Sequence, residues 1–338
     1  MRRYSDEFKR TAVRLSQQPG IQVQTVAAAL AIHPFMLSKW RKDAREGRLR
    51  GSAPKAPSVR TTRELARLEQ LEREYALLTE EHDFHTVDGR YAPFVKILRR
   101  DGFIVEPLRS GFSGATLAPA RILVIANATA DRNKDGDWTL PTPSAFAPEE
   151  IEALRQWVSG GGSLFLIADH MPFGGATADL AAAFGVLLTN GYATDATCGA
   201  DEFLFQRSDR TLGDHPITRG RGARERIDSV RTFTGEAFRV IGPAAPLLVL
   251  APETVLLFPS EAWKFSDATP RVLAEGLWQG ATLTRGRGRI AVFGEAAMFS
   301  AQVSGPQRRP MGMNMPAAAQ NPQFLLNVMH WLAGLLPE

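Results

Sequence analysis

Three short, uninterrupted apolar runs constrain the fold of this 338-residue chain most strongly. They are RILVIANA at 121–128, SLFLIAD at 163–169 and RIAVFG at 289–294. Runs of this length without polar alternation are typical of strands buried on both faces, as in a parallel sheet covered by helices. Segments with helical spacing separate or follow them, at 91–100, 148–157 and 323–336. The alternation predicts an α/β domain over residues 82–338 with a largely parallel sheet.

The N-terminal segment follows a different pattern, in which apolar side chains recur at helical spacing. Ser5 can cap a first helix, and a Pro-Gly pair ends it. A second short helix is predicted at 22–31, and a third begins at Pro34, whose fixed φ suits the first helical turn. We therefore expect a three-helix module over residues 1–50. A linker over 51–62, rich in Pro, Ser and basic residues, follows it.

Positive charge is concentrated at the same end of the chain. Residues 1–74 hold 16 Lys and Arg against 8 Asp and Glu, a net charge of +8, whereas the whole chain carries only +4. The remainder is therefore acidic, at −4. An asymmetry of this kind indicates an interaction of the basic segment with nucleic acid.

Two helices joined by a tight turn can place the second helix in the major groove of DNA. Here the second helix is the one predicted at 34–46, with Leu30, Leu37 and Trp40 packing inward. Basic and polar side chains on its outer face would reach base edges or phosphates, and an aromatic ring would touch a thymine methyl. The DNA-binding residues predicted in this way are Phe35, Ser38, Lys39, Arg41 and Lys42, with Arg2, Arg3 and Lys9 as phosphate contacts.

The stretches RRYSDEFKRTAVRLSQQPG, QTVAAALAIHP and LSKWRKDAREG resemble the OrfA-type N-terminal proteins of bacterial insertion-sequence transposases. The resemblance covers residues 2–78, closely to residue 47, and Trp40 between two basic residues is its most specific feature. It implies binding of the double-stranded ends of an insertion element. His33, expected to cap poorly, and Phe35 depart from the family pattern.

In the resembled system, a separate or fused subunit holds the three carboxylates that bind two metal ions for strand cleavage. No such carboxylate triad is found after residue 80. We therefore expect a protein that binds DNA without cutting it and that has a separate catalytic transposase subunit as a partner. Whether the chain is itself an enzyme is left open by its sequence.

Residues 63–81 have two interpretations. Leu68, Leu71, Tyr75 and Leu78 keep the spacing of a short coiled-coil seam, which would pair two chains as a homodimer. The same YALLT at 75–79 is also the one candidate for a first strand of the α/β domain. We favour the strand, since a missing central strand would leave backbone hydrogen bonds unmade.

The α/β domain has a resemblance of its own, carried by HDFHTVDGRYAPF, GGSLFLIADHMPFGG, GRIAVFGEAAMFSAQ and NPQFLLNVMHWLAG. These stretches resemble uncharacterised domains related to class I glutamine amidotransferases and to gliding-motility GldG-like proteins. The resemblance implies a flavodoxin-like fold. An amidotransferase needs a nucleophilic cysteine after a buried strand. Asp169-His170 occupies that position instead, and we interpret Cys198 as a half-buried thiol and not as a nucleophile.

Strand ends of a parallel sheet converge on one crevice, and histidines and carboxylates cluster after the predicted strands. They would form a hydrolase-like or ligand-binding site, either as acid and base or as ligands of a divalent metal such as zinc. The H-x-x-H pair in this set is by itself a weak signal of a metal site, because such pairs are often hydrogen-bonded loop histidines. The candidate residues are His82, His85, Asp88, Asp169, His170 and Glu295.

The single cysteine excludes an intrachain disulfide and a thiolate zinc cluster. The first residues contain no apolar run that would act as a signal peptide, and nowhere do 18 consecutive apolar residues occur. We therefore expect a cytoplasmic, nucleoid-associated protein with no membrane partner.

Overall fold

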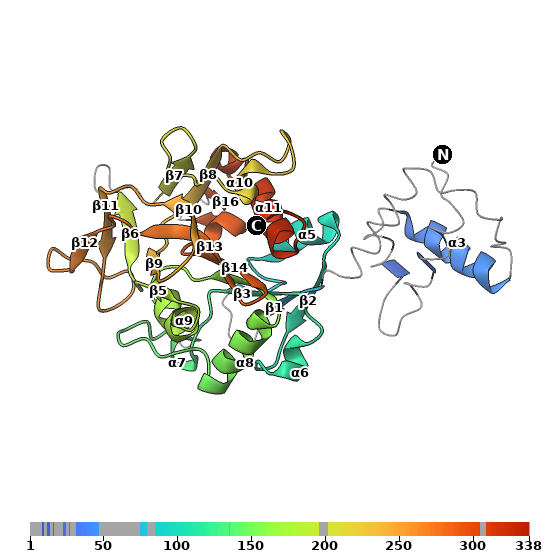
Figure 1. Cartoon of the computed structure of the whole chain (residues 1–338), viewed down its shortest axis with the longest axis horizontal. Helices are drawn as coiled ribbons and strands as arrows, with labels where there is room; N and C mark the ends of the chain where they lie inside the picture. Colours follow the sequence, from blue (N-terminus) through green and yellow to red (C-terminus); the bar gives the residue numbers. More distant parts are fainter. Residues whose placement is uncertain are drawn as a thin grey trace. The chain divides into compact units, whose positions relative to one another are not determined.

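The structure is a computed structural model of the whole chain. It describes residues 32–46, 75–79, 85–134, 136–195, 202–304 and 309–337, together with positions 9, 12, 13, 16, 23, 24 and 27. The chain forms two compact units (Figure 1). The first comprises Met1–Tyr75 with Leu98–Ile104, and the second comprises Ala76–Ile97 with Val105–Glu338.

The main element of the first unit is helix α3, Pro34–Arg45, within one residue of the predicted 34–46. Pro34 occupies the first helical turn, as expected. The expectation that His33 would cap poorly is wrong. Its Nδ1 atom accepts a hydrogen bond from the Phe35 backbone N–H at 3.2 Å, so an imidazole nitrogen takes the place of the usual hydroxyl.

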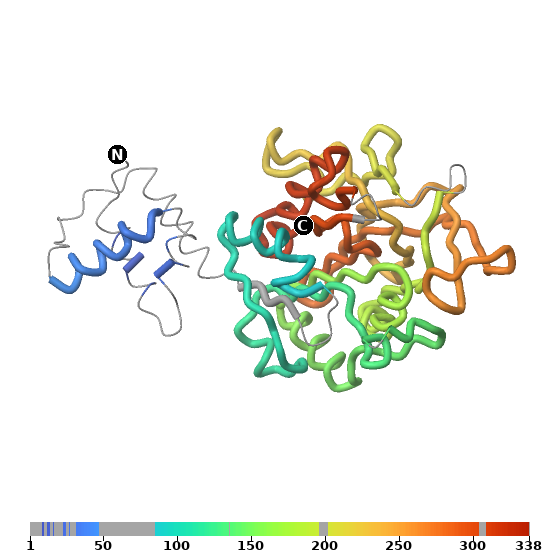
Figure 2. Tube along the Cα trace, turned by 180° about the vertical axis from the view of Figure 1, so that it is seen from behind, coloured from blue at the N-terminus to red at the C-terminus, as the bar shows by residue number. Residues whose placement is uncertain are grey.

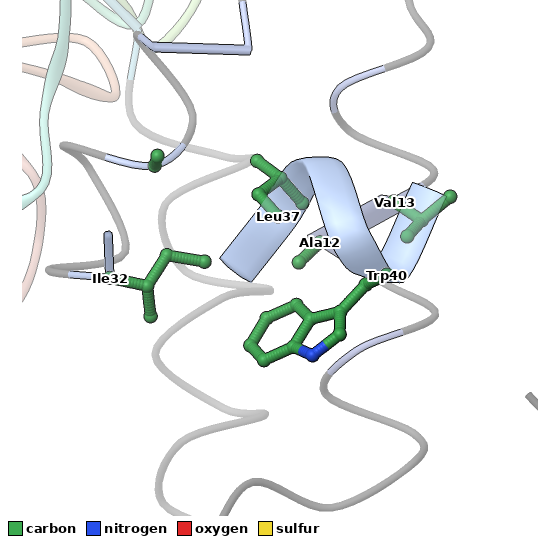
Figure 3. Close-up of a cluster of buried hydrophobic side chains, with 6 residues drawn as sticks. Ala12, Val13, Ile32, Leu37 and Trp40 are labelled. Carbon is green, nitrogen blue, oxygen red and sulfur yellow. The ribbon is translucent and has the colours of Figure 1, made fainter. Parts of the chain in front are cut away.

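A small apolar core lies beneath α3 (Figure 3). Leu37 and Trp40 are buried against four further side chains, Ala12, Val13, Ala27 and Ile32. The inward positions predicted for Leu37 and Trp40 are therefore correct. The described positions 9, 12, 13, 23, 24 and 27 are also helical, but most of residues 1–31 lie outside the described residues. The three-helix arrangement and the predicted position of Leu30 stay predictions.

The second unit is built on a nine-stranded sheet, in the order β2-β1-β3-β4-β14-β13-β9-β5 with β10 paired to β13. These strands come from segments scattered over the whole unit. They are β1 Tyr75–Thr79, β2 Ile104–Leu108, β3 Ile122–Ala126, β4 Ser163–Ile167, β5 Val186–Leu188, β9 Phe238–Val240, β10 Ala245–Val249, β13 Trp278–Arg285 and β14 Gly288–Phe293.

One half of this sheet is the parallel sheet that the sequence predicts. Strand β3 pairs in parallel with β1 and β4, and β4 pairs in parallel with β14. Every side chain of β3 and β4 is buried, which explains their unbroken apolar runs. The order β2-β1-β3-β4-β14 is the 2-1-3-4-5 order of flavodoxin-type sheets.

The other half is antiparallel, so the expectation of a largely parallel sheet is wrong for this half. Strand β13 pairs antiparallel with β14, β10 and β9, and β5 pairs antiparallel with β9. Strands β5 and β9 have three residues each, which is too short for an alternating pattern to stand out in a sequence.

The segment 75–79 is a strand and not part of a coiled coil. Ala76, Leu77 and Leu78 pair in register with Ile122, Leu123 and Val124 of β3. The favoured strand is therefore correct, and the seam through Tyr75 and Leu78 is wrong because these residues form a sheet. Leu68 and Leu71 lie outside the described residues.

Three smaller sheets complete the second unit: β6, β11 and β12 in one, β7 with β8, and β15 with β16. Figure 2 shows the β11–β12 segment in orange at the edge of this unit. The strands are β6 Tyr192–Asp195, β7 Glu202–Gln206, β8 Ser229–Phe233, β11 Thr254–Leu257, β12 Arg271–Leu273, β15 Ala301–Ser304 and β16 Arg309–Gly312.

Helices lie on both faces of the large sheet, with α8 below it and α11 above it in Figure 1. None of the described helices is long and apolar enough to cross a bilayer. The helices are α5 Ala92–Asp101, α6 Gly114–Leu117, α7 Asp131–Lys134, α8 Pro148–Ser159, α9 Phe173–Ala182, α10 Pro216–Arg219 and α11 Asn321–Leu332, with 3-10 turns η1 Ala297–Phe299 and η2 Pro316–Ala318.

Aromatic rings fill the layer above the parallel strands. Phe165 of β4 lies edge to face with Phe293 of β14 at 5.7 Å and with Phe299 of η1 at 5.2 Å between ring centroids. Phe324 of α11 is edge to face with Phe293 at 5.7 Å. These contacts join the central strands to the closing helix.

Replacing the central ring should therefore destabilise the second unit. We expect Phe165→Ala to lower the free energy of unfolding by about 3–5 kcal/mol, since it leaves a cavity among other rings. Urea unfolding followed by circular dichroism measures this. Ile241→Ala, at a side chain that is 61% exposed, is the control and should change stability by less than about 0.5 kcal/mol. Equal effects of the two changes would contradict the packing described here.

Candidate functional site

The carboxyl ends of three parallel strands bring polar side chains together in the second unit. Asn127 directly follows β3, Asp169 follows β4, and Glu295 follows β14. The Asp169 backbone N–H donates to Asn127 Oδ1 at 2.9 Å, and Asn127 holds a positive φ of 58°. Such a backbone is uncommon outside glycine, and asparagine tolerates it better than most residues. We call this region the strand-end site.

Asp169 and His170 are the residues of this site that solvent reaches, with side chains 10% and 11% exposed. His170 Nδ1 lies 2.8 Å from the carbonyl oxygen of Met171. Because a carbonyl only accepts, Nδ1 carries a proton, and Nε2 is the ring nitrogen that can accept one. That Nε2 lies 3.9 Å from Asp169 Oδ1. The His170 ring is stacked on Tyr192 at 4.5 Å, which fixes its orientation.

Glu295 is fully buried where β14 ends. Its two carboxyl oxygens accept hydrogen bonds from the backbone N–H groups of Ala297, at 2.5 Å, and Met298, at 2.8 Å, so it caps the turn η1. Burial raises the pKa of Glu295 well above its ordinary value, and the negative charge of Asp169 raises it further. Burial therefore favours the protonated form of Glu295.

A second buried carboxyl, Glu236, belongs to the site although the sequence analysis missed it. Its Oε2 accepts hydrogen bonds from the backbone N–H of Asn190, at 2.6 Å, and from Thr189 Oγ1, at 3.2 Å. Its Oε1 has no hydrogen-bond partner among the described residues. Burial raises the pKa of Glu236 well above its ordinary value, with a further contribution from Asp169.

Glu236 and Glu295 each lie in the middle of a Gly-Glu-Ala turn, at 235–237 and 294–296, and the two turns are in contact. The Glu236 backbone N–H donates to the Gly294 carbonyl at 2.7 Å. A Cβ atom on Gly235 would collide with that same carbonyl oxygen, and Gly235 has a φ of 82°. Glycine is required there for both reasons. The repeated tripeptide is the sequence signal that would have pointed to Glu236.

The remaining predicted residues fall into different positions. His85 is buried, and its ring meets Tyr91 at 4.9 Å between centroids. Burial, followed by the charges of Arg90 and His170, lowers the pKa of His85 to about 3, so the ring is neutral. Asp88 is exposed in the following turn, and His82 and Cys198 lie outside the described residues. Within the described part of the chain, no three His, Cys, Asp or Glu side chains gather so as to hold a metal ion.

In the first unit, α3 has one buried and one exposed face. Leu37 and Trp40 are buried, whereas Phe35, Ser38, Lys39 and Lys42 are exposed. The spacing 35, 38, 39, 42 is the helical i, i+3, i+4, i+7, so these four side chains form one stripe along the helix. Arg41 is half-buried beside the stripe, and so is Lys9. Arg2 and Arg3 lie outside the described residues.

Residues 1–76 match the sequence profile of a family described as "Transposase", whose members carry a helix-turn-helix. This match supports a transposase-type DNA-binding segment at the N-terminus. No curated protein matches the chain.

Solved structures match at low sequence identity. A structure of the mmIFT52 N-terminal domain is 15% identical, with a TM-score of 0.52, and the match covers 76% of this chain and 97% of that one. This likeness concerns the fold alone. A putative ThuA-like protein from Bacteroides uniformis is 12% identical, with 83% and 94% covered and a TM-score of 0.44. Cytoplasmic protein STM1381 from Salmonella typhimurium is 13% identical, with 77% and 99% covered and a TM-score of 0.43.

The raised pKa of Glu236 has a consequence for stability. The native state holds this proton more tightly than the unfolded chain does, so its contribution is fully present below the unfolded pKa of about 4.3 and is lost as pH rises toward the folded pKa. Glu236→Gln keeps the shape of a neutral carboxyl and does not titrate. We expect it to gain stability relative to the natural protein as pH rises, by up to about 1.4 kcal/mol per pH unit.

Urea unfolding between about pH 5 and pH 9 tests this expectation over the range above the unfolded pKa. Glu253→Gln, at an exposed loop position, is the matched control and should leave the pH dependence unchanged. The same pH dependence in the natural protein and Glu236→Gln would show that Glu236 is already ionised in the folded chain.

Proposed function

We propose that this protein binds double-stranded DNA through the exposed stripe of α3, as a helix-turn-helix protein of the transposase type. The observation that supports this most directly is the stripe itself, with Lys39 and Lys42 pointing to solvent on the face opposite Trp40. The match of residues 1–76 to the transposase profile supports the same function independently. Phe35, 72% exposed, would lie against a thymine methyl.

The finer parts of this proposal come from the resemblance. The DNA bound would be the end of an insertion element, read by α3 with phosphate contacts from Arg2, Arg3 and Lys9. Cleavage would belong to a separate catalytic transposase subunit.

Lys39 and Lys42 provide the test. Each lysine that neutralises a phosphate contributes about 0.9 to the slope of log affinity against log salt concentration. We expect Lys39→Ala and Lys42→Ala in the full-length chain each to reduce this slope by about that amount. Fluorescence anisotropy with a labelled duplex of random sequence measures it at several salt concentrations.

Lys96→Ala is the matched control, because Lys96 is also an exposed lysine on a helix, but on α5. It should leave the slope unchanged. If the natural protein fails to bind the duplex at low salt, or if all three variants change the slope equally, α3 is not the DNA-binding helix.

The strand-end site supports a second candidate function, ligand binding with acid and base groups in the second unit. Its specific support is the difference in environment among the site's side chains: burial raises the pKa of Glu236 and of Glu295, whereas Asp169 and His170 lie where solvent reaches the site. Pairs of titratable groups whose environments separate their pKa values are typical of sites that perform acid–base chemistry.

In this second function, His170 Nε2, where solvent reaches the site, would accept a proton from a ligand. Asp169 would stabilise the imidazolium that forms, since its Oδ1 lies within 3.9 Å of the nitrogen. Infrared spectroscopy tests the acid directly: a protonated carboxyl band at neutral pH should be reduced in Glu236→Gln. An unchanged band in that variant would contradict the assignment.

A further inference from the structure

Strand β12 lies at the edge of its sheet and has exposed side chains on both faces. Among the described residues it pairs with β11 alone, so the three-stranded sheet ends at β12 on that side. Arg271 is exposed, Val272 is 51% exposed and Leu273 is 61% exposed. Figure 1 shows β12 at the margin of its unit, with β11 and β6 further in. The second unit therefore presents a largely apolar strand edge to solvent.

The ladder with β11 uses only part of the β12 backbone. The Ala274 N–H, directly after β12, donates to the Thr254 carbonyl of β11 at 2.8 Å, so these two residues are a hydrogen-bonded pair. Bonded and non-bonded pairs alternate along an antiparallel ladder. Leu273 and Arg271 are therefore the residues that point their N–H and C=O groups away from β11. Such an outward row is a template for a further strand.

An edge of the large sheet in the same unit is protected against this kind of pairing. Strand β2 forms that edge, and it carries an exposed carboxylate, Glu106, followed by Pro107, which has no N–H to donate. Charges and prolines are common devices that keep edge strands from joining another chain. Strand β12 has no proline, and two of its three residues are apolar and more than half exposed.

The charges along the β12 edge make it complementary to itself. Arg271 and Glu275 are both exposed, and they lie two residues before and two residues after Leu273. Neither side chain forms an ion pair within the part of the chain that the structure describes. If two β12 strands lie antiparallel with the two Leu273 residues opposite each other, each Arg271 lies opposite Glu275 of the second copy. Opposite charges in such cross-strand positions stabilise a sheet.

We propose that β12 pairs antiparallel with β12 of a second copy of this chain, which joins two three-stranded sheets into one six-stranded sheet. The two-fold axis passes between the two Leu273 residues, which exchange their outward N–H···O=C bonds. Two pairs of Arg271 with Glu275 flank this axis. The inference is independent of both proposed functions. It places the pairing of chains in the second unit, at a segment different from the predicted coiled-coil seam.

Sedimentation velocity of the full-length chain over a series of concentrations tests the proposal. We expect a dimer that dissociates on dilution. Arg271→Glu and Glu275→Arg each place like charges opposite each other in both cross-strand pairs, so each should weaken association by about tenfold or more. The double variant Arg271→Glu/Glu275→Arg restores opposite charges and should recover the dimer. Leu273→Lys places two like charges at the axis and should abolish it.

Arg239→Glu is the matched control, because Arg239 is also an exposed arginine on a strand, but on β9. It should leave association unchanged. A natural chain that stays monomeric at every concentration would overturn the proposal and would leave β12 for a strand of a different protein. A dimer that persists in Leu273→Lys, or that the double variant fails to recover, would show that the chains pair elsewhere. Far-ultraviolet circular dichroism of each variant verifies that it is folded.

Discussion

Burial of neighbouring side chains is the constraint on which both units depend. In the first unit, Leu37 and Trp40 are buried in a core of small extent, and this alone determines which side of α3 faces solvent. In the second unit, complete burial raises the pKa of Glu236 and of Glu295 beside Asp169. In each unit, the polar groups proposed to act are held by apolar or backbone contacts that do not themselves meet a ligand.

The residues of the strand-end site are positioned in two different ways. The parallel strands deliver Asn127, Asp169 and Glu295 to one edge of the sheet, as the geometry of parallel sheets requires. Glu236 arrives by a different route, on a turn after β8 that is bonded to the Gly294 carbonyl. Without glycine at 235 the two turns could not approach, and Glu236 would lose its place beside Asp169.

The sequence predicted the elements with long, regular patterns. Strands β3, β4 and β14 and helices α3 and α8 lie within a few residues of their predicted bounds, because unbroken apolar runs and helical spacing report burial directly. The prediction of a strand at 75–79 was also correct, because without this strand the backbone of β3 would lack hydrogen-bond partners on one side. Short antiparallel strands such as β5 were not predicted, because three residues are too few to show an alternating pattern. Glu236 was not predicted because no buried apolar run precedes it. The capping role of His33 was not predicted because an imidazole rarely caps a helix.

We propose that DNA binds at α3 and that a different, small ligand binds at the strand-end site. Hydrogen exchange of the full-length chain, followed by mass spectrometry with and without a duplex of random sequence at low salt, tests this division most directly. We expect DNA to slow exchange in peptides covering α3 and to leave exchange unchanged in peptides covering β4 and the Asp169-His170 turn. Slower exchange at the strand-end site with no change in α3 would contradict it.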